Sequence, residues 1–195
     1  MIILKQVNNI KLNPNINVNV KELEFIGKGS QGKVYRIDSQ KCIKIFKNNK
    51  SCKNELKTLL MAQEDVHFPK LYEYGSNFII REYVNGVELN EYLAKRKLTP
   101  ELSSRLIELY ESIVRVGYER HDTAIFHILV TPSGELKLID TAKAMKKKSV
   151  IPNLLISGLE ELGYKDDFFN FLKINRPYLY PKWKNYSKKK YKKVY

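Results

Sequence analysis

The sequence predicts an α+β protein with two lobes, of which the first is built mainly from β-strands and the second is minimal and mostly helical. Short runs of β-branched and aromatic residues, separated by turn residues, fill residues 21–84 and are typical of an antiparallel sheet. Apolar residues at helical spacing follow at 99–116, 152–162 and 166–174. We therefore place an N-terminal lobe at 1–84, a C-terminal lobe at 85–181 and a basic tail at 182–195.

Positive charge is concentrated in the C-terminal tail. The chain has 195 residues and a formal net charge of +14, and seven lysines lie among residues 182–195. Lysines that alternate with Trp183, Tyr186 and Tyr191 favour contact with a polyanion, such as nucleic acid, an anionic membrane or an acidic protein. A solvated tail, with Trp183 in a packing role, explains the same residues. The polyanion contact is therefore one of two hypotheses for this segment.

The cysteines and the apolar segments indicate the compartment. Cys42 and Cys52 are the only cysteines, and they have no further ligands at a metal-binding spacing. The sequence lacks a secretory leader pattern and has no apolar run of the ~18 residues that a transmembrane helix needs. We therefore expect a cytoplasmic protein with reduced thiols and no transmembrane segment.

The first candidate site is a glycine-rich segment between two predicted strands. After a short strand near residues 16–20, an apolar strand leads into Gly27, Gly29 and Gly32, and a second strand contains Val34. Glycines at this G-x-G-x-x-G spacing allow backbone amides to approach phosphate oxygens, although a plain hairpin turn would use the same residues. Because a strand and not a helix follows, the pattern favours a hairpin lid over a nucleotide and excludes a dinucleotide-binding Rossmann fold.

A lysine lies in the middle of the next predicted strand. Within residues 41–46, Lys44 is flanked by apolar residues and shares a face of the strand with Cys42. A lysine in this setting is costly to bury unless it is paired. Glu55, in the helical pattern of residues 53–63, is the candidate partner, and a water-facing lysine on an edge strand is the alternative.

The link between the two lobes is expected after a second pair of strands. Residues 67–83 predict two strands around a Gly-Ser-Asn turn, and the loop that begins at Val84 leads to a short helix at 89–95. Residues 99–101 then supply a capping hydroxyl, a proline and an acid, all of which are favourable in the first turn of a helix. We expect this helix to end at Gly117.

Residues 120–144 contain a predicted hairpin with an acidic residue near each of its open ends. Two short strands, at 127–131 and 135–139, are joined by a Pro-Ser-Gly turn that favours a hairpin. Asp122 lies just before the first strand and Asp140 directly after the second. Two carboxylates brought together in this way can clamp a metal ion and phosphate groups.

In this order, the elements of residues 21–145 resemble the protein-kinase fold. The glycine-rich segment with Val34 resembles the loop that covers the phosphates of ATP. Lys44 resembles the strand lysine that holds the α- and β-phosphates, and Glu55 resembles its partner on a helix. The segment Glu82–Val84 resembles the hinge that hydrogen-bonds adenine through its backbone.

The resemblance also assigns roles to residues of the hairpin. The segment Arg120-His121-Asp122 stands where kinases have His-Arg-Asp, and Asp140 stands at the aspartate of Asp-Phe-Gly. The resemblance therefore implies that Asp122 is the catalytic base for an acceptor hydroxyl and that Asp140 binds Mg²⁺, or Mn²⁺, on ATP. His127 occupies the position of the asparagine that binds the second metal ion.

Several positions depart from the kinase pattern. His127 replaces asparagine, and imidazole is a less typical Mg²⁺ ligand than an amide oxygen. Thr141 and Ala142 replace phenylalanine and glycine, the catalytic-loop lysine is missing at residues 124–125, and Arg81 stands where an apolar side chain usually borders the adenine pocket. The Ala-Pro-Glu anchor of a long activation segment is missing as well. The chain thus resembles a minimal, atypical kinase, and in these departures it is similar to RIO or lipopolysaccharide kinases and to small bacterial kinase-like proteins.

Three functions remain open from the sequence. The first is a compact serine/threonine-kinase-like enzyme that transfers the γ-phosphate of ATP to a hydroxyl of a protein or small molecule. The second is a catalytically weak or inactive pseudokinase that binds a nucleotide or a partner, which the departures at His127 and Ala142 favour. The third is a polyanion-binding protein that acts through its lysine-rich tail, and this third function is compatible with either of the others.

Overall fold

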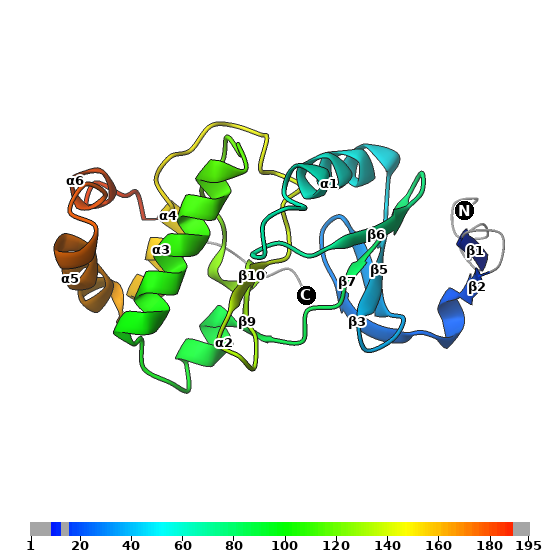
Figure 1. Cartoon of the computed structure of the whole chain (residues 1–195), viewed down its shortest axis with the longest axis horizontal. Helices are drawn as coiled ribbons and strands as arrows, with labels where there is room; N and C mark the ends of the chain where they lie inside the picture. The colour runs from blue at the N-terminus through cyan, green and yellow to red at the C-terminus, as the bar shows by residue number, and fades with distance from the viewer. Residues whose placement is uncertain (1–8, 13–15, 189–195) are drawn as a thin grey trace.

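The computed structural model describes residues 9–12 and 16–188, with side chains from residue 19 onward, and it shows two lobes side by side (Figure 1). A β-rich lobe holds the N-terminal part of the chain, and a mostly helical lobe holds the remainder. The predicted α+β class and two-lobed arrangement are therefore confirmed. No helix within the described residues is long and apolar enough to cross a membrane.

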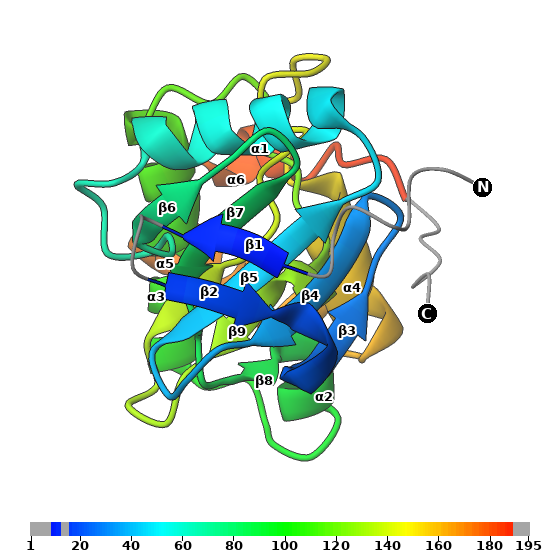
Figure 2. The same cartoon turned by 90° about the vertical axis from the view of Figure 1, so that its right-hand side faces the viewer.

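The N-terminal lobe consists of an antiparallel sheet, one long helix and a preceding hairpin. Its elements are β1 (Asn9–Leu12), β2 (Ile16–Asn19), β3 (Glu24–Lys28), β4 (Gly32–Arg36), β5 (Lys41–Phe46), α1 (Asn49–Met61), β6 (Leu71–Tyr74) and β7 (Phe78–Glu82). Strands β1 and β2 form the separate hairpin, which confirms the strand predicted near residues 16–20. The sheet has the order β3-β4-β5-β7-β6, and α1 lies along one side of it (Figure 2).

Helix α1 covers the face of the sheet that carries alternate residues of the central strand β5. Phe46 and Ile79 from this face pack against Cys52 and Leu59 of α1. Ile43 belongs to a second apolar cluster on the opposite face. The side-chain alternation predicted for β5 is thus confirmed, and both faces of the central strand are buried.

The C-terminal lobe combines a small sheet with the longest helix of the described chain. Its elements are β8 (Val87–Glu88), α2 (Leu89–Leu93), α3 (Pro100–Arg115), β9 (Ile128–Val130), β10 (Leu136–Leu138), α4 (Asn153–Glu161), α5 (Lys165–Asn175) and α6 (Tyr180–Trp183). The three strands have the order β10-β9-β8. The predicted hairpin, β9 with β10, is confirmed, and Gly134 in its turn adopts a positive φ of 83°.

Two helix boundaries follow from capping side chains. The Asn48 side chain accepts a hydrogen bond from the Ser51 amide at 2.9 Å, so α1 begins earlier than the predicted Lys53. The Thr99 hydroxyl accepts a hydrogen bond from the Leu102 amide at 3.2 Å, which confirms the predicted start of α3.

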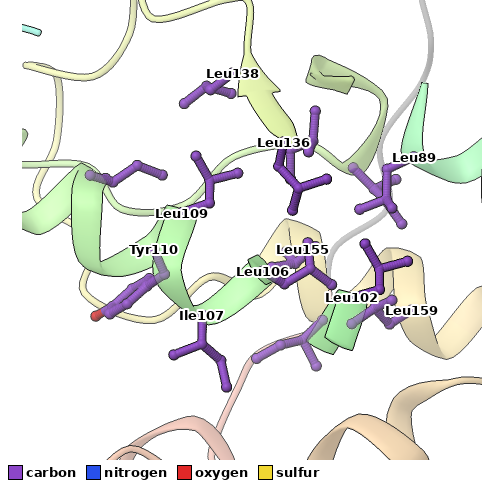
Figure 3. Packing of buried hydrophobic residues seen from close by; sticks show 14 of the residues in the cluster. Leu89, Leu102, Leu106, Ile107, Leu109, Tyr110, Leu136, Leu138, Leu155 and Leu159 are labelled. Carbon is purple, nitrogen blue, oxygen red and sulfur yellow. The ribbon is translucent and has the colours of Figure 1, made fainter. Parts of the chain in front are cut away.

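The main core lies between α3, the small sheet and α4. Figure 3 shows leucines from these elements meeting in one cluster, with Leu106 of α3 close to Leu136 of β10 and Leu155 of α4. Leu106, Leu136 and Leu155 are each no more than 3% exposed. This packing fixes β9 and β10, and therefore the residues at the ends of their hairpin, against the rigid body of the lobe.

The start of the basic tail belongs to this core. Trp183 is completely buried, and its ring contacts Tyr110 edge-on at 4.6 Å and stacks with Phe168 at 6.1 Å between centroids. The packing role considered for Trp183 is therefore confirmed, and contact of its ring with a polyanion is excluded, because no face of the indole is accessible. Tyr191 lies outside the described residues.

Candidate active site

The lysine in the middle of β5 is paired with the glutamate of α1. Lys44 Nζ and Glu55 Oε2 form a direct ion pair, and the two side chains are only 9% and 3% exposed. Burial raises the pKa of Glu55, and the positive charge of Lys44 opposes that shift. Because β5 is a central strand and Lys44 is buried, the alternative of a water-facing edge lysine is excluded.

A buried polar contact holds α1 against the segment after Asp140. The hydroxyl groups of Thr58 and Thr141 lie 2.8 Å apart, and both residues are about 4% exposed or less. The Tyr118 hydroxyl donates a second hydrogen bond, at 2.8 Å, to the Thr58 carbonyl. Thr141, a departure from the kinase pattern, therefore docks the helix that carries Glu55.

Asp140 and His127 face each other at the open end of the hairpin. His127 Nε2 lies 3.9 Å from Asp140 Oδ2, and the side chains are 32% and 26% exposed. Burial opposes ionisation of Asp140, but the charge of Lys44 holds its pKa below the ordinary value. Burial also lowers the pKa of His127. The pair therefore presents a carboxylate and a neutral imidazole near pH 7.

The backbone at His127 differs from the prediction. Residues Ile125–His127 form a turn of 3₁₀ helix, and strand β9 begins only at Ile128. The His127 amide donates to the Ala124 carbonyl at 3.0 Å, and the His127 carbonyl accepts from the Ile139 amide at 3.0 Å. The assignment of His127 to the first hairpin strand is therefore wrong, because its amide closes a local turn, and only its carbonyl still bonds across the hairpin.

The side chains of Asp140 and His127 fit a metal ion that is already bound to a phosphate group. The described part of the chain contains no group of three or more His, Cys, Asp or Glu residues that could hold a metal ion. Asp140 and His127 can supply two ligands, and Mg²⁺ commonly binds one or two protein groups together with phosphate oxygens and water. Asp140 fits this ion well, whereas the His127 imidazole is a weaker partner for it.

Asp122 has a structural contact that the sequence did not indicate. Its Oδ1 accepts a hydrogen bond from the Leu154 amide at 2.6 Å, and Arg120 Nη2 lies 3.6 Å from Oδ2. Leu154 is in the first turn of α4, whose N-cap residue, Pro152, makes no side-chain cap. The Asp122 carboxylate therefore caps α4 from a distant segment, where the helix dipole favours negative charge.

A cleft of about 380 Å³ opens between the glycine-rich segment and the hairpin. The tip of the glycine-rich segment, residues 28–31, forms one wall. Asp122, His127 and Asp140 line the opposite wall. Lys44 and Glu55 do not line this cleft, and the charge of Lys44 reaches it through its effect on Asp140.

The three predicted glycines have different surroundings. A Cβ atom at Gly27 or Gly29 would meet no atom within 4 Å, so space is open on that side of the loop. A Cβ atom at Gly32 would lie 2.0 Å from the carbonyl oxygen of Ile45. Gly32 is thus needed for the close approach of β4 to β5, whereas Gly27 and Gly29 border open space. Val34 lies opposite Lys44 in the register of β4 and β5.

The connection between the lobes carries a second ion pair. Both carboxylate oxygens of Glu82 lie 2.7 Å from Lys137 Nζ, which β10 carries. Glu82 also accepts a hydrogen bond from the Lys70 amide at 3.1 Å. Val84 follows and is 8% exposed. The structure therefore places Glu82 and Val84 at the link between the lobes. The Glu82 side chain is directed to the hairpin, and the role of its backbone as a hinge for adenine stays a prediction.

Comparisons with known proteins agree with this arrangement of elements. No protein-family model matches the chain. The protein YrzF of Bacillus subtilis (strain 168), named as a candidate serine/threonine-protein kinase, is 22% identical over 135 residues, which are 66% of this chain and 63% of YrzF. The match thus spans less than two thirds of that relative's length.

Two solved structures have a similar fold. WbdD superimposes with a TM-score of 0.58 at 15% identity, over 82% of this chain and 40% of WbdD. The kinase domain of PknI from Mycobacterium tuberculosis, in a cysteine-to-alanine variant, gives a TM-score of 0.51 at 13% identity, over 80% of this chain and 81% of that domain. The narrower likeness to RIO kinases stays a prediction. The chain therefore has a fold similar to that of a kinase domain, as the order of its motifs predicts.

Proposed function

We propose that the chain is a compact atypical kinase that transfers the γ-phosphate of ATP to a hydroxyl group of a protein or small-molecule acceptor. One observation carries the proposal: an aspartate and a glycine-rich lid line one cleft of a kinase-like fold, and the nearby Lys44 of a buried lysine–glutamate pair keeps that aspartate ionised. The name of the Bacillus subtilis relative, a candidate serine/threonine kinase, supports the same activity.

Lys44 and the glycine-rich segment would bind the phosphates of the nucleotide. Glu55 fixes the direction of the Lys44 ammonium group, so that its hydrogen bonds are available to phosphate oxygens without reorganisation. Backbone amides near Gly27 and Gly29 would cover the phosphates, because no side chain at these positions keeps them apart. Asp140, with His127 as a weaker second ligand, would hold a Mg²⁺ or Mn²⁺ ion, which neutralises phosphate charge when it is bound.

Asp122 would orient the acceptor hydroxyl and accept its proton. The Leu154 amide and Arg120 hold the carboxylate in place at the wall of the cleft. Lys143 also lines the cleft, and it would supply the positive charge that position 124 lacks. Phosphoryl transfer requires little covalent chemistry from the protein, so this alignment and charge placement would provide the acceleration.

A pseudokinase is the second candidate function, and the contact of Asp122 favours it. A carboxylate that caps α4 has a structural reason to be present, whether or not it accepts a proton. Such a protein would bind the nucleotide through Lys44 and Asp140 and transfer no phosphate.

Phosphate transfer and nucleotide binding, measured side by side, distinguish these functions. The wild type and Asp140→Asn are incubated with radiolabelled ATP and Mg²⁺ or Mn²⁺, and the thermal shift caused by the nucleotide is recorded. Asp167→Asn, an exposed aspartate on α5, is the matched control. Transfer or hydrolysis that Asp140→Asn loses and Asp167→Asn keeps supports the kinase. A thermal shift without turnover supports the pseudokinase. The absence of both a thermal shift and turnover would overturn both functions.

A further inference from the structure

A buried arginine lies beside the candidate site without a direct ion pair to a carboxylate of the described residues. Arg81, on β7, is 6% exposed, and its Nε is buried without a hydrogen-bond partner. Within the described residues, its side chain makes neither a hydrogen bond nor an ion pair. A buried guanidinium group with no direct ion pair, and with an Nε that has no hydrogen-bond partner, is unfavourable for folding. Its presence therefore indicates that an anion completes this position in another state of the protein.

Strand register places Arg81 next to the lysine of the ion pair. Arg81 lies opposite Cys42, so Lys44 is its diagonal neighbour on β5. Diagonal neighbours on one face of an antiparallel sheet are about 7–8 Å apart, which a long side chain spans. A phosphate group bound to the Lys44 ammonium would therefore lie within reach of the Arg81 guanidinium.

The charge of Arg81 also acts on the two acidic residues of the site, Glu55 and Asp140. Burial has the largest effect on the pKa of both Glu55 and Asp140, and the charge of Lys44 has the next largest. The charge of Arg81 lowers both pKa values as well. Glu55 is already held by Lys44, so it does not serve as a direct counter-ion for Arg81.

We propose that Arg81 is a second cationic ligand for the phosphate chain of the nucleotide, next to Lys44. The inference rests on the proposed nucleotide site and adds a residue to it. A guanidinium group presents a planar fork of donors that matches two phosphate oxygens, and such charge-assisted bonds are stronger than neutral ones. The bound phosphate would supply the direct counter-ion that the described residues do not place within ion-pair distance of Arg81. The affinity of the protein for a nucleotide would then depend more on the phosphate chain than on the base.

A steric role for Arg81 predicts a different result. An arginine that only fills the space behind the base would exclude the base and contribute nothing to phosphate binding. Its replacement by a thinner apolar side chain would then strengthen the binding of adenosine. The phosphate role predicts that adenosine binding is unchanged and that ADP binding is weakened.

Calorimetric titration of ADP and adenosine tests the proposal. The variants are Arg81→Met, which keeps side-chain length without charge, Arg81→Lys, which keeps the charge without the fork, and Arg96→Met, an exposed control. We expect Arg81→Met to weaken ADP binding by about tenfold to a hundredfold, with Arg81→Lys intermediate. Adenosine binding stays within about twofold in all variants, because it carries no phosphate.

Thermal unfolding of the unliganded variants provides the second measurement. We expect Arg81→Met to unfold at a higher temperature than the wild type, because it no longer buries an unpaired charge. Equal weakening of ADP and adenosine, unchanged ADP binding, or stronger adenosine binding would each overturn the phosphate role of Arg81. A wild-type protein that binds neither ADP nor ATP would overturn the proposed function itself, which is a separate outcome of the same titration.

Discussion

Replacement of Lys44 by methionine removes the charge that balances a buried carboxylate. In Lys44→Met, the Glu55 side chain, which is 3% exposed, loses the ammonium group beside it. An unpaired buried carboxylate costs several kcal/mol, so Glu55 takes up a proton instead. The pKa of Glu55, which burial already raises, then rises further because the opposing charge is gone.

The free energy of that protonation sets the size of the effect. From an ordinary pKa of 4.5, protonation costs about 3.4 kcal/mol at pH 7 and about 0.7 kcal/mol at pH 5, at 1.36 kcal/mol per unit. The free energy of unfolding should therefore fall by up to about 3.4 kcal/mol at pH 7. The folded variant holds one proton more than its unfolded chain, so about 2.7 kcal/mol of stability returns as the pH falls from 7 to 5.

Urea unfolding followed by circular dichroism measures this pH dependence directly. Lys57→Met, on the exposed side of α1, is the control and should show no comparable slope relative to the wild type. The double change Lys44→Met with Glu55→Gln should remove the extra pH dependence, because no titratable group remains at the pair. An equal loss of stability at pH 5 and pH 7 in Lys44→Met would show that protonation of Glu55 does not cause the loss.

Four further substitutions test the packing of the two lobes. Gly29→Ala should leave the thermal midpoint of unfolding unchanged, because the added Cβ meets no atom within 4 Å. Gly32→Ala should lower the midpoint, because its Cβ would lie 2.0 Å from a backbone oxygen of β5. Equal midpoints for the two variants would contradict this difference. Thr141→Val removes the hydroxyl 2.8 Å from that of Thr58 and should lower the urea-measured unfolding free energy by about 1–2 kcal/mol; no loss would mean that this contact does not hold α1. Trp183→Ala should cost about 3–5 kcal/mol in the same assay, and a cost typical of a surface residue would contradict its burial.

Local sequence signals predicted the elements and part of the site. A capping threonine and a following proline marked the start of α3, and a Pro-Ser-Gly turn marked the hairpin of β9 and β10. The pairing of Lys44 with Glu55 followed from the cost of burying a lysine on a strand that a helix follows. These features depend on residues close together in the chain or on a strong energetic rule, so the sequence contains them.

Contacts between distant segments were not predictable in the same way. Asp122 caps α4 through Leu154, 32 residues away, and Pro152 before that helix gives no capping signal. Thr58 and Thr141 are 83 residues apart, and the sequence around each of them does not indicate a buried contact. Such pairs become visible only when the packing of the lobes brings them together.

Two residues show how neighbours in the sequence can mislead. Trp183 stands between lysines, and that pattern is shared by exposed polyanion-binding segments, yet the core of the lobe buries its ring. Arg81 was notable as an exception to the apolar side chain expected there. Its burial, with an Nε that has no hydrogen-bond partner, depends on the pairing of β7 with β5, which the local sequence does not show.

Labelling of Lys44 by a reactive nucleotide tests whether ATP binds beside the buried pair of Lys44 and Glu55. An ATP derivative with an acyl group on its terminal phosphate transfers that group to a lysine amine beside the bound phosphates, and mass spectrometry identifies the labelled residue. We expect that Lys44 is labelled, that excess ATP with Mg²⁺ protects it, and that Asp140→Asn reduces the protection. Labelling confined to exposed lysines, with no protection by ATP, would contradict a nucleotide site at the buried pair.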